Sequence, residues 1–360
     1  MKINKLAPTF LLLLTTALVI AACKKEDEEG DKSSFDKKAL LTNLSENMIL
    51  PAVNQYNEDV NTLLVDFQDF EQNTTAQQLE IVQESWKQAY LSWQTVKIFD
   101  FGPIRDIGMK GATATYPIDT SQVNDNVQSG SYNLASLSNV DAIGLSTVDY
   151  LLHRQGALDS LQNNAKVVDY TADVIGKLVD ESNTITTEWS SYQSTFNNST
   201  GTSSTSAFSK LINEYNRDFE LAKTAKVGVP LGKQSLDVPL PNYVEARYGD
   251  LSFDLLRASL VALKKVYNGQ SFETGNDGVG MDDYLVHLEE NDLDNMIDSG
   301  FQEMIDKTDE FSMTLEDALE NDTQRMNELY NMLQGQVVHI KTDMTSAFGV
   351  LITYQDNDGD

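Results

Sequence analysis

The spacing of apolar residues is the strongest constraint on how this chain can fold. From about residue 35 onward, apolar side chains recur every three or four positions. A period near 3.6 residues gives an amphipathic helix with one buried face, and no sustained alternating run indicates a strand. We therefore predict an all-α protein. The clearest stripes consist of Leu79, Val82, Trp86, Ala89, Trp93 and Val96; Val168, Ile175, Leu178, Ile185, Trp189, Tyr192 and Phe196; Phe208, Leu211, Tyr215 and Phe219; Leu329, Leu333, Ile340, Met344 and Leu351.

Proline and linker positions predict how the helices are grouped. Pro51 interrupts a helical pattern, where it should kink or split the helix, and the other prolines of the body lie in two loop-like regions. Residues 197–206, NNSTGTSSTS, contain no apolar side chain and indicate a linker. We expect two up-and-down helical bundles packed together, at residues 35–196 and 207–360. Their similar size suggests a duplication.

Composition excludes several classes of function. The 360 residues include 26 Lys and Arg against 55 Asp and Glu, a net charge of −29, which disfavours any nucleic-acid partner. A single cysteine excludes a disulfide framework and a thiolate zinc cluster, and three histidines argue against a histidine-rich metal site. No glycine-rich phosphate loop or nucleophile elbow is present.

The first 23 residues predict an export signal. Two lysines precede an apolar run at 9–22 that is too short to span a bilayer as a helix. The run ends in two alanines directly before Cys23, the only cysteine, and this end is similar to a bacterial lipobox. Cys23 would then be the lipidated first residue of the mature protein. The alternative is an ordinary signal peptide followed by a chance cysteine.

An acidic segment follows the predicted lipidation site. Residues 24–34 are too polar to fold alone and predict a solvated tether. Their lysine-then-acid order is similar to the surface-export signal of some Gram-negative lipoproteins, and the alternative is a spacer in the periplasm. We expect a cell-envelope protein anchored through lipid to the outer membrane, on its periplasmic or its surface-exposed face.

Two segments of the body carry a family resemblance. Residues 84–103 read ESWKQAYLSWQTVKIFDFGP, with two tryptophans on one helix face before an aromatic-Gly-Pro turn. Residues 244–269 read VEARYGDLSFDLLRASLVALKKVYNG, and GVGMDDYL follows at 278–285. In this order they resemble the two domains of the imelysin-like proteins. That family includes proteins named insulin-cleaving membrane protease and relatives in bacterial iron-uptake systems.

The namesake motif of that family, Gly-x-His-x-x-Glu, is altered here. The matching segment begins at Gly144, but Ser146 replaces the histidine and Asp149 replaces the glutamate. A histidine and a carboxylate three residues apart can reach one ion, whereas a serine hydroxyl is a poor ligand for zinc-like metals. Metallopeptidase chemistry needs a Lewis-acidic metal with an open position. We therefore expect no peptidase activity and no catalytic residues.

A neighbouring pair of residues could replace the metal ligands that the altered motif lacks. Asp149 and His153 are four residues apart on a helix and would share a face, which makes them the metal-binding candidates. The interpretation we favour places His153 and Arg154 in the last turn of a helix that ends before Gly156, where basic groups are favourable.

Other metal-like patterns have simpler explanations. The H-x-x-E at His287 is expected on a solvated helix face, and His339 is expected to be a packing residue. The tail at 356–360 resembles the opening of a calcium loop, but the sequence ends before the glutamate at the twelfth position. We expect a frayed acidic tail there.

The resemblance places the family's ligand site in the cleft between the bundles. It implies that Ser146 and Asp149 lie there with Arg247, Tyr248 and Ser252. Trp86 is expected in the core, with one edge along the cleft. Arg105 and Arg247 would each bind an anion or a buried carboxylate, or else form an ordinary salt bridge.

These expectations give one leading function and two alternatives. The leading function is a membrane-anchored, extracytoplasmic binding or accessory protein in iron or haem acquisition, with iron as the candidate ligand and uptake proteins as partners. The first alternative is a metallopeptidase with a rebuilt metal site. The second is a structural surface lipoprotein whose acidity provides solubility.

Overall fold

A computed structural model describes residues 34–354, and within this range all regular structure is helical. The all-α prediction is therefore confirmed. The described residues from Asp36 onward belong to one compact unit. Cys23, residues 24–33 of the predicted tether, and the tail at 356–360 lie outside the described residues. None of the helices in the described part is both long and apolar enough to cross a membrane.

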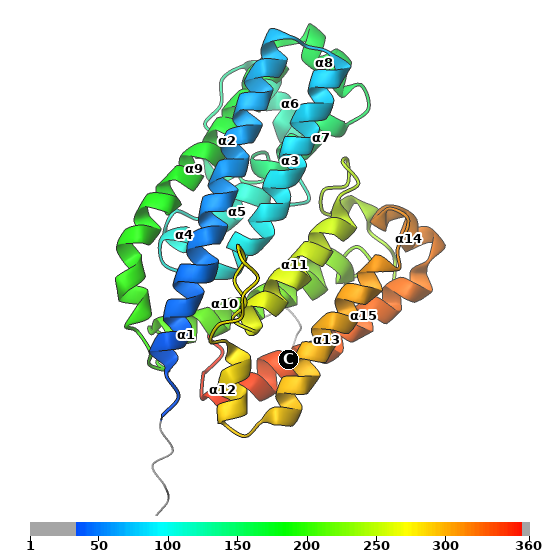
Figure 1. Ribbon diagram of the computed structural model, residues 1–360. Coiled ribbons are helices and arrows are strands. Elements are labelled where there is room, and N and C mark those ends of the chain that lie inside the picture. Colours follow the sequence, from blue (N-terminus) through cyan, green and yellow to red (C-terminus); the bar gives the residue numbers. More distant parts are fainter. Residues whose placement is uncertain (1–33, 355–360) are drawn as a thin grey trace, which may run out of the picture. The chain divides into compact units, whose positions relative to one another are not determined.

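The first half of the unit is built around three long helices (Figure 1). Helix α2 packs against α3 and α9, and α7 packs against the same two helices. The elements are α1 (Lys37–Leu44), a π-helical turn (Ser45–Ile49), α2 (Leu50–Gln72), α3 (Ala76–Val96), a 3-10 turn (Lys97–Phe99), α4 (Pro103–Asp106), α5 (Met109–Ala114), α6 (Thr120–Ser129), a 3-10 turn (Leu137–Asn139), α7 (Gly144–His153), α8 (Ala157–Asn163) and α9 (Ala165–Asn197).

The second half is a smaller set of packed helices. Helix α13 packs against α11 and α15, and α10 runs into a π-helical turn. The elements are α10 (Ala207–Leu221), the π-helical turn (Ala222–Gly228), a 3-10 turn (Pro241–Tyr243), α11 (Ser252–Tyr267), α12 (Met281–His287), α13 (Asn291–Asp309), α14 (Leu315–Asn321), α15 (Thr323–Val337), a π-helical turn (Val338–Met344) and α16 (Thr345–Phe348).

The two halves meet along helices that are distant in sequence. Helix α3 packs against α11, and the 3-10 turn after α3 packs against α10. Residues 199–206 form no helix and connect α9 to α10, whereas Asn197 is still the last residue of α9. The division into two domains and the duplication stay predictions.

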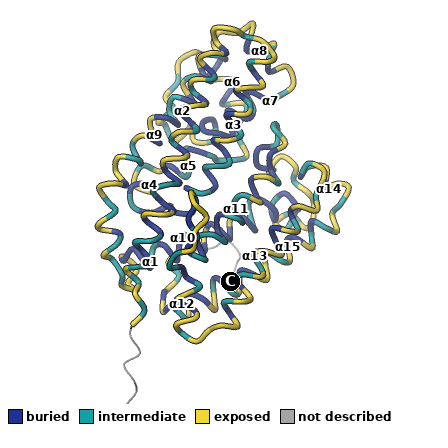
Figure 2. Tube along the Cα trace, in the orientation of Figure 1, coloured by how far each residue is buried: buried dark blue, intermediate teal, exposed yellow. Residues whose placement is uncertain are grey.

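The predicted apolar stripes form most of the interior (Figure 2). The stripes of α3 and α10 are entirely buried. Val168 and Tyr192 of α9 are only half-buried. The assignment of Leu351 to the last stripe is wrong, since 79% of this residue is exposed. Gly349 ends α16 in the left-handed conformation, so Leu351 lies beyond the helix whose period we extended.

Pro51 acts as predicted, through a π-helical turn. The turn Ser45–Ile49 separates α1 from α2, and Pro51 is the second residue of α2. Proline has no N–H to donate, and because the residues before Pro51 are themselves helical, the π-helical turn is where the backbone hydrogen bonds adjust to the missing donor.

Candidate functional site

Helix α7, which carries the altered motif, is held by a close backbone approach at its first residue. Gly144 has φ +81°, and an added Cβ would lie 2.3 Å from the carbonyl oxygen of Thr113 and 2.5 Å from that of Ala112. Only glycine tolerates both the conformation and the contact. Gly144 therefore fixes α7 against α5, and this contact sets where Ser146 and Asp149 lie.

Asp149 is the centre of a small polar network. Its residue is 1% exposed, and its Oδ1 lies 3.2 Å from Nδ1 of His153. The backbone N–H of Tyr248 donates to Oδ2 at 3.1 Å, and that of Gly249 also donates to this carboxylate. Burial raises the pKa of Asp149, and the contacts with His153 and the two N–H groups oppose that rise.

Aromatic side chains form the wall behind this network. The indole N–H of Trp86 donates to the carbonyl of Leu145 at 2.9 Å, and its ring lies 4.5 Å from that of His153, centroid to centroid. The hydroxyl groups of Tyr90 and Ser146 are 3.0 Å apart. Trp86 is almost completely buried, so it supports the site and does not face solvent.

The structure brings four predicted site residues to one cavity of about 280 Å³. Ser146, Asp149, Arg247 and Tyr248 all line it. The Arg247 guanidinium lies over the Tyr248 ring at 5.5 Å and forms an ion pair with Glu316, Nη2 to Oε1, at 2.7 Å. The cavity thus presents a carboxylate, a guanidinium and a phenol to a ligand. Its other lining residues are Tyr116, Pro117, Ile118, Thr120, Asn242, Val244 and Ala246.

Comparison with known families identifies the chain. The family model described as Imelysin, which bears a peptidase label, matches residues 49–340. The chain belongs to the imelysin family. No curated protein sequence matches it significantly.

Two crystal structures are similar to this chain in fold. One, described as an iron-regulated protein A precursor from Parabacteroides distasonis, has a TM-score of 0.75 and 14% identity, over 87% of this chain and 95% of that one. The other, an imelysin-like protein from Psychrobacter arcticum, has a TM-score of 0.71 and 17% identity, over 89% of this chain and 97% of that one. At these identities the likeness shows the fold alone.

The residues present do not fit a peptidase metal. Across residues 34–354, no group of three or more His, Cys, Asp or Glu side chains is arranged to hold a metal ion. At the motif itself, Asp149 and His153 contact each other, and the position of the family's histidine carries the Ser146 hydroxyl. Catalytic zinc sites use three protein ligands and a water. We therefore derive no step through a metal.

The described structure does not assemble a serine nucleophile at Ser146. A serine nucleophile needs a base within hydrogen-bond reach. Within the described part of the chain, the Ser146 hydroxyl is paired with Tyr90, and no hydrogen bond joins it to His153. His153 is the last residue of α7, so the predicted helix end is also correct.

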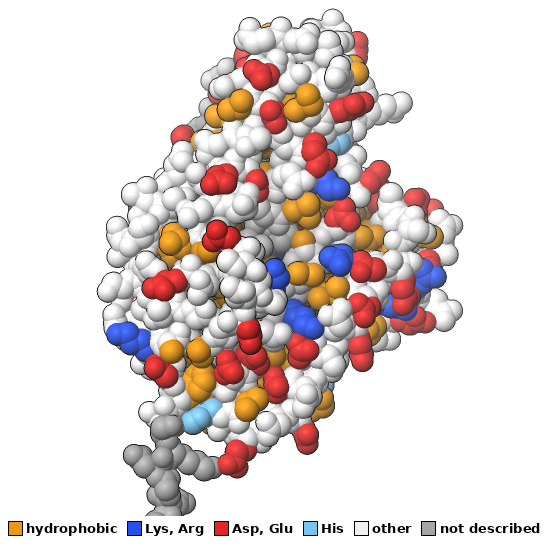
Figure 3. All heavy atoms as spheres, in the orientation of Figure 1, with side chains coloured by type: hydrophobic (Ala, Val, Ile, Leu, Met, Phe, Trp, Pro, Cys, Tyr) orange, Lys and Arg blue, Asp and Glu red, His pale blue; other side chains and the backbone are white. Residues whose placement is uncertain are grey.

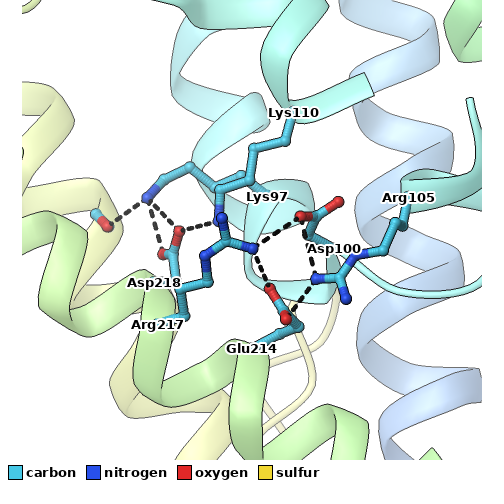
Figure 4. Close-up of polar contacts among 8 residues, drawn as sticks. Lys97, Asp100, Arg105, Lys110, Glu214, Arg217 and Asp218 are labelled. Atoms are coloured by element: carbon cyan, nitrogen blue, oxygen red, sulfur yellow. Dashed lines mark hydrogen bonds and ion pairs between the residues drawn. The ribbon is translucent and has the colours of Figure 1, made fainter. Parts of the chain in front are cut away.

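Two predicted site residues lie elsewhere. Ser252 is buried and its hydroxyl donates to the carbonyl of Glu245, so it does not line the cavity of Asp149. Arg105 forms ion pairs with Glu214 and Asp100 beside a second cavity (Figure 4). Glu214 is buried on α10, so Arg105 pairs with a buried carboxylate, and the same contact is a salt bridge between the two halves.

The remaining histidines agree only in part with expectation. His287 is exposed at the end of α12, as predicted for a solvated face. His339 is only half-buried, and its Nδ1 lies 3.4 Å from Oδ2 of Asp343. Its interpretation as a packing residue is wrong, because a carboxylate one turn away holds it near the surface.

A buried ion pair was missed by the sequence analysis. Nζ of Lys97 lies 3.0 Å and 2.8 Å from the two carboxylate oxygens of Asp218, and both side chains are almost completely buried. Lys97 follows Trp93 by four residues and Asp218 follows Tyr215 by three, so both charges lie on apolar helix faces. Opposite charges on two apolar stripes are the pattern that could have predicted the pair.

Proposed function

We propose that this protein is an extracytoplasmic binding or accessory protein in iron or haem acquisition that does not hydrolyse peptides. The observation that carries the proposal is the set of contacts made by the Asp149 carboxylate. The backbone N–H groups of Tyr248 and Gly249 already donate to its carboxylate, and its Oδ1 lies 3.2 Å from Nδ1 of His153, which also lies 3.1 Å from the Asp149 carbonyl oxygen. A carboxylate held in this way suits recognition of a ligand better than support of a hydrolytic metal.

The size of the cavity favours a small ligand. Its volume of about 280 Å³ lies just below the range of roughly 300–1,000 Å³ typical of pockets for drug-sized molecules. Because backbone N–H groups already donate to the Asp149 carboxylate, iron would arrive with its coordination supplied by other donors. The guanidinium of Arg247 would then recognise a negative charge on such a complex. A structural relative described as an iron-regulated protein supports the link to iron.

The location is part of the same proposal. Lipidation of Cys23 would anchor the protein to the outer membrane, behind an acidic tether, on its periplasmic or surface-exposed face. Its partners would be the membrane itself and the proteins of an uptake system. A ligand-binding unit on a tether can exchange ligand with such proteins without leaving the membrane.

A metallopeptidase is the second candidate, favoured by one contact. The 3.2 Å between Asp149 Oδ1 and His153 Nδ1 places two potential ligands side by side. To become a metal site, the pair would need a third ligand that moves into place when the metal binds.

One sample tests both candidates. The protein is titrated with ferric citrate and with haem, followed by absorbance, and is incubated with a peptide mixture with and without chelator. We expect saturable binding of at least one iron species, and no cleavage. Arg247→Gln should weaken that binding at least tenfold. Arg257→Gln is the control, because Arg257 forms a similar ion pair with Asp309, Nε to Oδ1, at 2.6 Å.

Two results would overturn the proposal. Cleavage that stops with chelator and with Asp149→Ala would support the metallopeptidase. Absence of binding to either iron species, without cleavage, would leave the structural surface lipoprotein as the account.

A further inference from the structure

A second cavity, of about 440 Å³, collects basic side chains in a chain that is strongly acidic. Five basic and three acidic residues line it, whereas the whole chain has 26 Lys and Arg against 55 Asp and Glu. Acidic side chains are spread over the face of the molecule drawn in Figure 3. The reversed balance is therefore a local property of this cavity. The charged lining residues are Lys97, Arg105, Lys110, Arg217, Lys226, Asp100, Asp218 and Glu245.

The inner part of the cavity has more positive than negative groups. Lys97 and Lys110 both contact Asp218, and the Lys110 Nζ is 3.3 Å from its Oδ1. Lys226 forms an ion pair with Glu245. Three ammonium groups therefore face two carboxylates, which leaves one positive charge without a counter-charge. The pKa of Lys226 is lowered to about 8, chiefly by burial and further by Lys97, although Glu245 opposes this.

Two basic groups at the cavity have hydrogen-bond donors to spare (Figure 4). Arg217 lies 3.6 Å from an oxygen of Glu214 and 3.9 Å from one of Asp100, and neither distance is short enough for a hydrogen bond. Lys110 makes a single long contact with an Asp218 carboxylate that Lys97 already binds through both oxygens. A guanidinium has five donors and an ammonium has three. Both can therefore donate to a ligand.

Apolar groups complete the wall. Trp93, Tyr116 and Leu221 line the cavity together with alanine and glycine residues. Leu221 and Tyr116 supply most of the accessible apolar area, because Trp93 is only 2% exposed. The cavity thus combines excess positive charge with apolar area, and its volume falls in the range of small-molecule pockets.

We propose that this cavity is a binding site for a small organic monocarboxylate, with the carboxylate between Lys110 and Arg217 and the apolar body against Tyr116 and Leu221. One negative charge balances the single excess positive charge, whereas an inorganic phosphate dianion would exceed it and would leave the apolar wall uncovered. A carboxylate also matches the planar donor fork of an arginine. The proposal does not depend on the function proposed for the cavity of Asp149.

Calorimetric titration of the protein with benzoate tests this assignment. Benzyl alcohol serves as the neutral analogue and inorganic phosphate as the anion without an apolar body. We expect benzoate to bind at least tenfold more tightly than either. Lys110→Met should weaken benzoate binding at least tenfold. Lys264→Met is the matched control, because the two lysine side chains are each 20% exposed and each lies 3.3 Å from one aspartate oxygen.

The remaining outcomes would overturn the proposal. They are equal binding of benzoate and benzyl alcohol, preferential binding of phosphate, no measurable binding of benzoate, or equal losses in the two lysine variants. Thermal unfolding of both variants shows that they are folded. If Lys110→Met fails to fold, Arg217→Gln replaces it, with Arg257→Gln as the control, since these side chains are 44% and 46% exposed.

Discussion

Replacing Gly249 by alanine tests the packing around Asp149. An added Cβ would lie 2.8 Å from two ring carbons of Trp86 and 2.9 Å from Oδ1 of Asp149. Ordinary contacts of a Cβ begin at 3.4 Å, so the ring or the backbone must move by about 0.6 Å. Trp86 is buried and hydrogen-bonded to Leu145, so it cannot rotate away without losing that bond. We expect Gly249→Ala to lower the free energy of unfolding by about 1–3 kcal/mol, the usual cost of overpacking a buried site.

Gly176→Ala is the matched control. Gly176 lies within α9, and nothing is within 4 Å of the position of an added Cβ. Alanine is favoured over glycine in a helix interior by about 0.5–1 kcal/mol, so this variant should be more stable than the parent. Urea unfolding followed by circular dichroism measures both. If Gly249→Ala is as stable as the parent protein, the contacts described around Asp149 are wrong.

Two further predictions concern buried charges. Asp218→Asn leaves the buried Lys97 without its counter-charge and should lower the free energy of unfolding by about 3–5 kcal/mol. The control Asp309→Asn, at an exposed ion pair, should lower it by less than about 1 kcal/mol. Equal losses in urea unfolding would contradict this prediction. Burial and neighbouring acids raise the pKa of Asp282 to about 7. Between about pH 4 and 7 the folded protein still holds this proton, whereas the unfolded chain has lost it. The Asp282 carboxyl group therefore lowers the free energy of unfolding as the pH rises. Asp282→Asn should be about 1–2 kcal/mol more stable than the parent at pH 8, after allowance for its partial exposure, and equal to it below pH 4. The exposed Asp292→Asn should not show this pH dependence, and thermal unfolding at several pH values measures all three proteins.

The helices could be predicted because their determinants are local. A buried stripe such as that of α3 depends on the helical period alone. Leu351 was misassigned because the period continues in the sequence past Gly349, where the helix ends. The role of Pro51 could also be predicted, since proline restricts its own backbone whatever the surrounding fold.

The candidate site was only partly predictable, because it depends on which segments meet. The altered motif pointed to Ser146 and Asp149, and the resemblance brought Arg247 and Tyr248 to the same place. Ser252 and Arg105 lie near matching segments but face other neighbours. Sequence position alone does not tell which way a side chain points. The charges on two apolar stripes could have indicated buried ionic groups, but Lys97 and Asp218 are 121 positions apart and could be paired only once the packing of the turn Lys97–Phe99 against α10 was known.

The central claim is that the residues around Asp149 do not form the metal site of a peptidase. Zinc titration by calorimetry tests it most directly, with the parent protein, Asp149→Asn and His153→Gln compared at neutral pH. Our account predicts no sub-micromolar zinc site that depends on Asp149, because the backbone N–H groups of Tyr248 and Gly249 already donate to that carboxylate and, among the described residues, no third ligand lies beside Asp149 and His153. A stoichiometric zinc ion bound tightly by the parent and lost in both variants would contradict it.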